Sequence, residues 1–301
     1  MHHMLIVDGS NLLFQMFYGM PAGITDVQGR PIQGTVGFVG ALLRVIRMIA
    51  PTHVAVLFDG ECANPRRQLF ADYKANREDF SQLPEEETPF SQLPDIYAVL
   101  DCLGICHRET TDCEVDDWIA GYAYRYGRGN RLTILSQDSD FFQLINENVT
   151  VLRYRAERSV RCDIPYIQEK LGINPGQYAD FKALTGDTSD HIKGAPGIGP
   201  KTAAALLQQF GTLEAVLENT HAVKKPSVRS SLQKSAAALR LNYQLIKLGQ
   251  AVTLPFPLEQ MAYTHRDMTT GEVLRAVGVY RVEQTQKFLH NNCISISQMV
   301  R

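Results

Sequence analysis

The sequence has no excess of charge of either sign. Its 301 residues contain 30 Lys and Arg against 32 Asp and Glu, which gives a formal net charge of −2 at pH 7. Phosphate affinity depends on where basic side chains converge rather than on their total number. The global charge therefore neither indicates nor excludes a nucleic-acid partner, and any such prediction must rest on local placement.

Long apolar runs are also missing. No run approaches the roughly 18 residues that a membrane-spanning helix needs, so we expect no membrane partner. The first apolar run, residues 4–7, is followed at once by Asp8, whereas a secretory signal would continue longer and would contain no acid. We therefore expect a cytoplasmic protein.

Paired cysteines are absent as well, since none of the six cysteines belongs to a Cys-X-X-Cys pair. Cys102, Cys106, His107 and Cys113 lie close in sequence, but their spacing fits no common zinc motif. Plain thiols in a reducing compartment are the favoured interpretation.

Short apolar runs rich in β-branched residues alternate with helical patterns in the first half of the chain. Apolar residues recur at helical spacing over 36–49, and the helical pattern Trp118–Tyr126 follows an acidic turn typical of a helix start. Strands separated by helices predict an α/β fold, with a central, mostly parallel sheet and helices on both faces. The expected strands are Leu5–Val7, Val54–Phe58, Leu132–Leu135 and Val149–Leu152.

A polar excursion with three prolines, residues 78–94, interrupts this pattern and is expected at the surface. From about Pro165 the strand signal fades and helical patterns take over. We predict a core at 1–165, a helical region at 166–250, and an extension at 251–301 that packs on the core and ends in disorder. The expected helices are Ile167–Leu171, Tyr178–Leu184, Thr202–Phe210, Leu213–Glu218, Ser227–Leu248, Gly271–Val277 and Val282–Leu289.

Acidic residues follow three of the predicted strands. Ligands of open α/β sheets bind outside the carboxyl ends of the strands, so these acids should gather at one edge. A helix start at 114–117 adds more acids, and residues 187 and 190 are spaced to share one side of a helical turn. The set is Asp8, Asp59, Glu114, Asp116, Asp117, Asp138, Asp140, Asp187 and Asp190.

Carboxylates gathered in this way would need cations. Two unit charges ~4 Å apart repel by about 4 kcal/mol at an effective dielectric near ~20. Oxygen ligands select Mg²⁺ or Mn²⁺, and two such ions about 4 Å apart suit displacement at phosphorus. A single Asp at a strand end is more often a turn cap. From the residues alone, a two-metal site and a set of structural caps both remain open.

Closely spaced glycines precede the apolar helix expected at 203–210. Gly194, Gly197 and Gly199 let the backbone approach a partner and aim several N–H groups in one direction. Lys201 and Thr202 open the following helix, which favours a phosphate at this end. The segment has the signature of a helix-hairpin-helix that grips sugar-phosphate without reading bases; an ordinary glycine turn is the alternative.

Taken in order, these motifs resemble a known family. Over residues 4–250 the chain is similar to the 5′→3′ exonuclease domain of bacterial DNA polymerase I and to free-standing bacterial and phage flap endonucleases. The resemblance implies a PIN-like or resolvase-like nuclease core, an arch at 78–94 and a helix-hairpin-helix region at 166–250. The segments that carry it are Asp8–Asn11, Phe58–Gly60, Tyr73–Arg77, Glu114–Asp117, Ser136–Asp140 and Gly186–Ala203.

The resemblance also implies roles for individual residues. Lys74 would stabilise charge at the scissile phosphate, Tyr73 would stack on a base, and Arg66 and Arg77 would bind neighbouring phosphates; a solvated basic face is the alternative for this segment. The metal nearer the scissile phosphate would be held by Asp8, Asp59, Glu114 and Asp116. The second metal or its water shell would be surrounded by Asp117, Asp138, Asp140, Asp187 and Asp190. Main-chain carbonyls of Leu184, Thr185, Lys193, Ala195 and Ile198 would hold K⁺.

By resemblance, the chain is a structure-specific 5′ nuclease that hydrolyses DNA near 5′ ends or flaps with two Mg²⁺ or Mn²⁺ ions. It would act as a monomer at the nucleoid on a 5′ end, flap or duplex junction, with DNA polymerase I as a partner. Gln15 stands where members of this family commonly carry an arginine directed at phosphate, and Glu85–Glu87 make the arch acidic. Both features favour the alternative of a catalytically weak, structure-specific DNA-binding paralogue. A PIN-like ribonuclease is a further alternative, although that fold lacks the glycine-rich segment.

Overall fold

The computed structural model describes residues 2–60, 65–75, 80, 83–84, 87–249 and 252–279. Four of the features predicted above lie outside these residues: Arg77, the acidic pair Glu85 and Glu86, the helix expected at 282–289, and the disordered end of the extension. Among the described helices, none is both long and apolar enough to cross a membrane.

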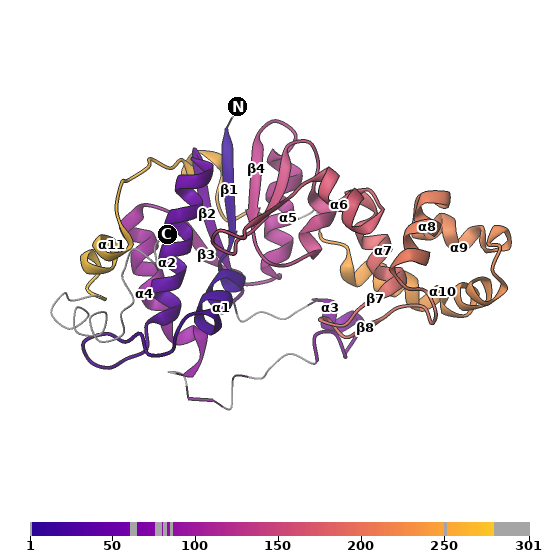
Figure 1. Ribbon diagram of the computed structural model, residues 1–301, viewed down its shortest axis with the longest axis horizontal. Helices are drawn as coiled ribbons and strands as arrows, with labels where there is room; N and C mark the ends of the chain where they lie inside the picture. Colours follow the sequence, from indigo (N-terminus) through magenta and orange to yellow (C-terminus); the bar gives the residue numbers. More distant parts are fainter. Residues whose placement is uncertain are drawn as a thin grey trace.

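A six-stranded sheet lies at the centre of the larger lobe (Figure 1). Its order is β3-β2-β1-β4-β5-β6; β6 runs antiparallel to β5, and all other neighbouring pairs are parallel. This confirms the predicted mostly parallel sheet. The order reverses direction beside β1, so the switch point at which such sheets bind ligands lies between β1 and β4. The strands are β1 His3–Asp8, β2 His53–Phe58, β3 Cys106–Glu109, β4 Arg131–Leu135, β5 Val149–Arg153 and β6 Val160–Cys162.

Helices cover both faces of the sheet, as predicted. Successive side chains of a strand point to opposite faces, so Met4 and Ile6 pack toward α5 while Leu5 and Val7 pack toward α1, α2 and α4. A strand that is buried on both faces reads as a continuous apolar run, which is why the sequence reveals β1 and β2. The helices are α1 Gly9–Gly19, α2 Gln33–Ile49, α4 Leu93–Leu103 and α5 Val115–Tyr126.

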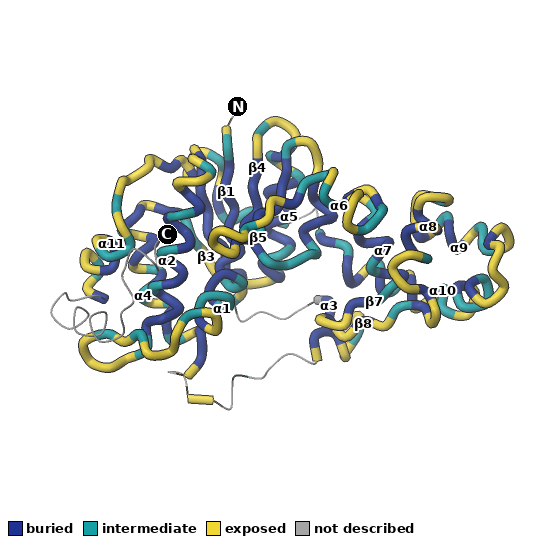
Figure 2. The backbone as a smooth tube through the Cα atoms, viewed as in Figure 1, coloured by how far each residue is buried: buried dark blue, intermediate teal, exposed yellow. Residues whose placement is uncertain are grey.

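The helical region lies beyond the β6 edge of the sheet (Figure 1). Its buried side chains belong to the same hydrophobic cluster as the α5 face of the sheet, and Figure 2 shows buried positions continuing from the sheet into α7 and α10. The two regions therefore share one core. The elements are α6 Ile164–Leu171, α7 Tyr178–Thr185, β7 Gly186–Asp187, β8 Ile192–Lys193, α8 Pro200–Phe210, α9 Leu213–Glu218 and α10 Pro226–Ile246.

Two connecting segments bear on the site. The short helix α3 (Pro65–Leu69) lies beside the β7–β8 hairpin in Figure 1, and its chain returns to the core through a 3-10 turn at Pro89–Gln92. The described part of the C-terminal extension lies against the core: the Tyr263 N–H donates to the Thr52 carbonyl at 2.9 Å, and α11 (Thr270–Ala276) contacts α2 and α4.

Candidate metal and nucleic-acid site

Two acids predicted at strand ends connect five elements at the carboxyl edge of the sheet. Asp8, at the end of β1, caps α1 by accepting from the Asn11 N–H at 3.0 Å, and it accepts from the Ser136 hydroxyl after β4 at 2.8 Å. Asp59, after β2, accepts from the N–H of Val115 at 3.1 Å, at the start of α5. These carboxylates are therefore turn caps and members of a cluster at once.

Acids from separate segments of this cluster act on one another electrostatically. Burial raises the pKa of Asp8 to about 7, with further contributions from Asp59 and Asp138. Burial also raises the pKa of Asp116 well above its usual range; Asp138, Asp59 and Asp8 add to the shift, and Lys74 opposes it. The charges of Asp59 and Asp138 therefore disfavour the ionisation of Asp8 and Asp116, which lie in a poorly solvated place.

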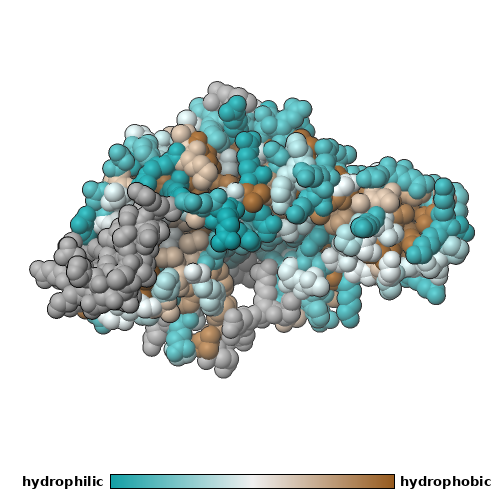
Figure 3. Space-filling view, viewed as in Figure 1, coloured by the Kyte–Doolittle hydropathy of each residue, from teal (hydrophilic) through white to brown (hydrophobic). Residues whose placement is uncertain are grey.

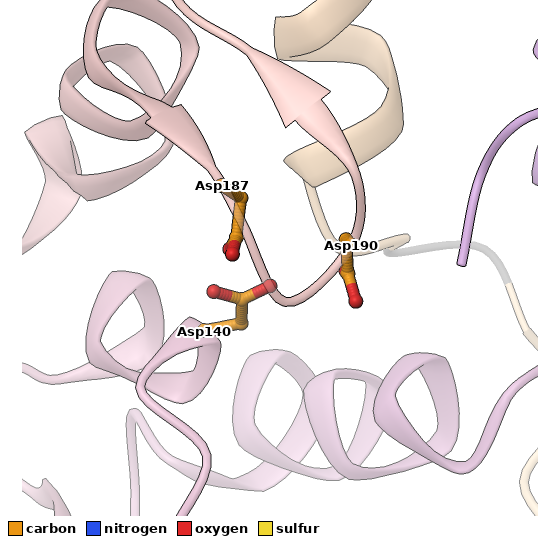
Figure 4. Close-up of side chains that lie close together, drawn as sticks. All are labelled: Asp140, Asp187 and Asp190. Atoms are coloured by element: carbon orange, nitrogen blue, oxygen red, sulfur yellow. The ribbon is translucent and has the colours of Figure 1, made fainter. Parts of the chain in front are cut away.

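A second group of acids lies at the β7–β8 hairpin. Carboxylate oxygens of Asp140, Asp187 and Asp190 all fall within 4.8 Å of one another, and Figure 4 shows the Asp140 carboxylate between the other two. Burial, then the charge of Asp138, raises the pKa of Asp140 to about 8, with Lys182 opposing.

Asp187 is held in its charged form by neighbours. Burial alone would raise its pKa, but Lys182 Nζ at 2.5 Å and the Ser189 hydroxyl at 2.5 Å outweigh that effect and lower it. Nothing in the spacing of Lys182 identifies it as this partner, because the pair forms only where α7 meets β7.

The donor set of both groups fits a hard divalent cation. Every candidate ligand is a carboxylate oxygen, which suits Mg²⁺ or Mn²⁺ rather than a softer metal. Two carboxyls with pKa values of about 7 and about 8 are at the point where a nearby cation would favour the charged form. Eight of the nine predicted acids lie in or beside these groups; Asp117 does not.

Asp117 and Arg66 form a buried ion pair, which bears on two of the predicted roles. Arg66 Nη1 and Nη2 bind the two oxygens of Asp117 at 2.8 and 2.7 Å, and the Gly249 N–H also donates to Asp117 at 2.8 Å. Nη1 further binds Glu114 at 2.6 Å, Nε binds the Leu245 carbonyl at 2.9 Å, and Nη2 reaches the Lys247 carbonyl at 3.5 Å.

All five donors of a guanidinium are directed to these acceptors. Only 10% of the Arg66 side chain is exposed, so it is not placed to bind DNA phosphate as predicted. Asp117, whose two oxygens face Arg66, is not placed to surround a metal. Arg66 instead joins α3, the start of α5 and the end of α10.

Tyr73 and Lys74 are also buried, with different consequences. Tyr73 is 3% exposed and its hydroxyl donates to Glu114 at 3.3 Å, so the residue is buried in this arrangement, and stacking on a base stays a prediction. Lys74 is held with a φ of 56°; its N–H donates to the Asp190 carbonyl at 3.2 Å and its Nζ binds Glu114. Lys74 therefore lies between the two groups of acids.

The glycine-rich segment has the backbone that its sequence requires. A Cβ on Gly194 would lie 2.3 Å from the Thr185 carbonyl carbon, and Gly197 has a φ of +76°, which favours glycine. Gly199 precedes α8, Lys201 is exposed and Thr202 is half-buried. The positive end of α8 and one lysine are thus accessible at this turn.

Three of the five carbonyls predicted to hold K⁺ already accept a hydrogen bond. Leu184 accepts from the Ala195 N–H at 3.0 Å, Ala195 from Ile198 at 3.1 Å, and Lys193 from the Asn242 amide at 2.8 Å. A carbonyl has a second lone pair, so each can still coordinate an ion. The cation site, which also includes Thr185, remains a prediction.

Comparison with known proteins gives matches along most of the chain. The family described as "5′-3′ exonuclease, N-terminal resolvase-like domain" matches residues 3–172, and "5′-3′ exonuclease, C-terminal SAM fold" matches residues 173–269. DNA polymerase I of Rhizobium leguminosarum is 35% identical over 267 residues, which cover 86% of this chain and 26% of that protein. The thermostable DNA polymerase I of Thermus aquaticus is 34% identical over 273 residues, with 90% and 31% covered. The chain thus spans less than a third of the length of these relatives.

Solved structures share the fold at lower sequence identity. The T5 D15 protein co-crystallised with metal ions aligns with a TM-score of 0.68 at 21% identity, covering 81% of this chain and 89% of that one. The catalytic core of Rad2 in complex with DNA substrate aligns with a TM-score of 0.58 at 15% identity, covering 96% and 91%.

Proposed function

Because this chain belongs to the 5′-3′ exonuclease family, we propose that it is a structure-specific 5′ nuclease, which hydrolyses DNA phosphodiesters near 5′ ends or flaps. The observation that carries the proposal is the convergence of acids from four segments at the switch point of the sheet, next to Asp140, Asp187 and Asp190. Such convergence is unfavourable without a cation, and an oxygen-only site suits phosphoryl chemistry.

Two divalent cations, Mg²⁺ or Mn²⁺, would there activate water and stabilise the leaving oxygen. The chain's own residues prepare this place. Ser136 and Lys182 fix the orientation of Asp8 and Asp187 through hydrogen bonds. Lys74, buried beside Glu114, supplies a fixed positive charge close to both groups of acids.

The DNA would be positioned by the glycine-rich turn. N–H groups at Gly194, Gly197 and Gly199 and the start of α8, with Lys201 and Thr202, would contact phosphates of a duplex, and K⁺ would bind the neighbouring carbonyls. We further propose that the core at 1–165 carries out the hydrolysis and that the region at 166–250 binds the DNA. Action as a monomer at the nucleoid together with a DNA polymerase I belongs to the same proposal, since the relatives described above are DNA polymerases of that type.

The test is cleavage of a 5′-flap oligonucleotide in Mg²⁺. We expect Asp187→Asn with Asp190→Asn to abolish cleavage, while the exposed pair Asp101→Asn with Asp267→Asn leaves it unchanged. Equal cleavage by the wild type and the first variant would reject the assignment. Binding in Ca²⁺ without cleavage in Mg²⁺ or Mn²⁺ would favour the DNA-binding paralogue. Faster cleavage of an RNA flap of the same sequence would favour the ribonuclease.

A further inference from the structure

Positive charge is concentrated in one short segment that the proposed function does not use. Residues 153–161 contain four arginines, Arg153, Arg155, Arg158 and Arg161, and one acid, Glu157. The chain as a whole has a net charge of −2, so this segment stands out locally. Arginines that converge on one surface form an electrostatic footprint for phosphate.

Three of these arginines line a pocket at the turn between β5 and β6. The pocket has a volume of about 360 Å³, and Val160 and Tyr166 complete its wall. Two bonds fix the turn: the N–H of Arg158 donates to the Arg155 carbonyl at 3.0 Å, and the N–H of Arg155 donates to the Ser159 hydroxyl at 2.9 Å. The turn is exposed on the face seen in Figure 2, and hydrophilic side chains gather there in Figure 3.

The pocket lies at the same edge of the sheet as the acids. Strand β5 is parallel to β4, so both strands end at that edge. Arg153 Nη2 donates to the Gln137 carbonyl at 2.7 Å, and Arg155 Nε donates to the Gln137 side-chain oxygen at 3.3 Å. Gln137 directly precedes Asp138, so the arginines are attached to the loop that carries the acids.

Binding capacity remains in this pocket. Nε of Arg153 is buried and has no hydrogen-bond partner among the described residues. Arg155 and Arg158 are exposed. The two acids nearest in sequence are engaged elsewhere: Glu157 pairs with Arg44 at 3.4 Å, and Asp163 accepts from the Tyr166 N–H at 3.1 Å. A planar guanidinium matches phosphate oxygens in a bidentate manner.

We propose that this pocket, lined by Arg153, Arg155 and Arg158, binds a backbone phosphate of the DNA strand that passes the cleavage point. The proposal rests on the proposed nuclease function and adds a third place of contact, beside the acids and the glycine-rich turn. Val160 and Tyr166 give the neighbouring sugar an apolar wall. The site reads no base, because phosphate contacts carry no sequence information directly.

The test compares two charge-matched double variants. Arg155→Ala with Arg158→Ala removes the exposed charges of the pocket. Arg128→Ala with Arg131→Ala removes two exposed arginines at the start of β4, at the opposite edge of the sheet. Affinity for a 5′-flap DNA is measured in Ca²⁺ across a salt series, with thermal unfolding as a check on folding. We expect about tenfold weaker binding for the pocket variant, and a slope of log K against log salt smaller by about 0.9 per lost contact. The control variant should stay within about twofold.

A phosphate map then locates the contact. Single phosphates on each side of the cleaved bond are replaced by neutral methylphosphonates. We expect the wild type to lose affinity at one or two positions where the pocket variant loses nothing further, because a contact that is already gone cannot be removed twice. Equal effects of the two double variants, or additive losses at every position, would overturn the pocket assignment. A wild type that binds but does not cleave in Mg²⁺ refutes the nuclease function alone, since the binding comparison is still decided.

Discussion

Arg66 offers the sharpest test of how α3 is attached to the core. Arg66→Met keeps the bulk of the stem and removes the guanidinium, which leaves Asp117 as a buried carboxylate that still accepts from the Gly249 N–H. Glu114 keeps its bond to Lys74, so most of the unpaired charge falls on Asp117. Breaking a buried pair by removing one partner costs about 3–5 kcal/mol, and the retained contacts place the expected loss near about 3 kcal/mol.

The loss is measured as the free energy of unfolding in urea. At an m value of about 3 kcal/mol/M, the midpoint should fall by about 1 M. The exposed neighbour provides the control, since Arg67→Met should change stability by less than about 0.5 kcal/mol. The double variant Arg66→Met with Asp117→Asn should recover part of the loss, because no unpaired charge is then left.

The opposite result would identify Arg66 as a DNA-binding residue. In that case Arg66→Met would leave the free energy of unfolding within about 1 kcal/mol of the wild type and would lower the salt dependence of DNA binding by about one phosphate contact. Such an outcome would refute the burial of the guanidinium between Asp117 and Glu114.

Three further predictions follow from the site. In EDTA, the free energy of unfolding should fall as pH rises from about 4 to about 8. The pKa values of Asp8 and Asp140 in the folded chain, about 7 and about 8, make the folded chain bind more protons than the unfolded chain over this range. Mn²⁺ should reduce the fall, and a free energy of unfolding that rises across this range in EDTA would contradict the prediction. Lys182→Met should raise the pKa of Asp187 and weaken Mn²⁺ binding, measured by calorimetry, more at pH 6 than at pH 8. Lys170→Met, at an exposed position, is the control, and equal Mn²⁺ affinities of the two variants would refute the pairing of Lys182 with Asp187. Gly194→Ala should destabilise the chain by about 1–3 kcal/mol in thermal unfolding, since its Cβ would lie 2.3 Å from a backbone carbon, whereas Gly176→Ala meets open space; similar losses at the two positions would contradict the tight turn.

The buried centre of the fold could be predicted from sequence, but its edges could not. Strands β1 and β2 are apolar on both faces and therefore give an unambiguous signal. Strand β3 escaped prediction because its four residues, Cys106–Glu109, are polar and partly exposed. Helix α4 was not predicted, because it starts at the end of the predicted surface excursion; Pro94 lies in its first turn, where the missing N–H is tolerated.

Some residues of the site could likewise be predicted from the sequence, and others could not. Acids that follow strands could be placed because a parallel sheet brings the ends of its strands together. The roles of Arg66 and Asp117 could not be predicted, because the sequence does not show whether a basic side chain faces solvent or a buried carboxylate. Their pairing joins positions 51 residues apart and depends on how α3 packs on α5.

The central claim is that the acids at the sheet edge form a divalent-cation centre, and crystals soaked in Mn²⁺ test it most directly. Anomalous difference density should show Mn²⁺ bound to oxygens of Asp140, Asp187 and Asp190, and a second peak among Asp8, Asp59, Glu114 and Asp116, with Asp117 still paired to Arg66. Density that is absent from both places at a saturating Mn²⁺ concentration would contradict the account.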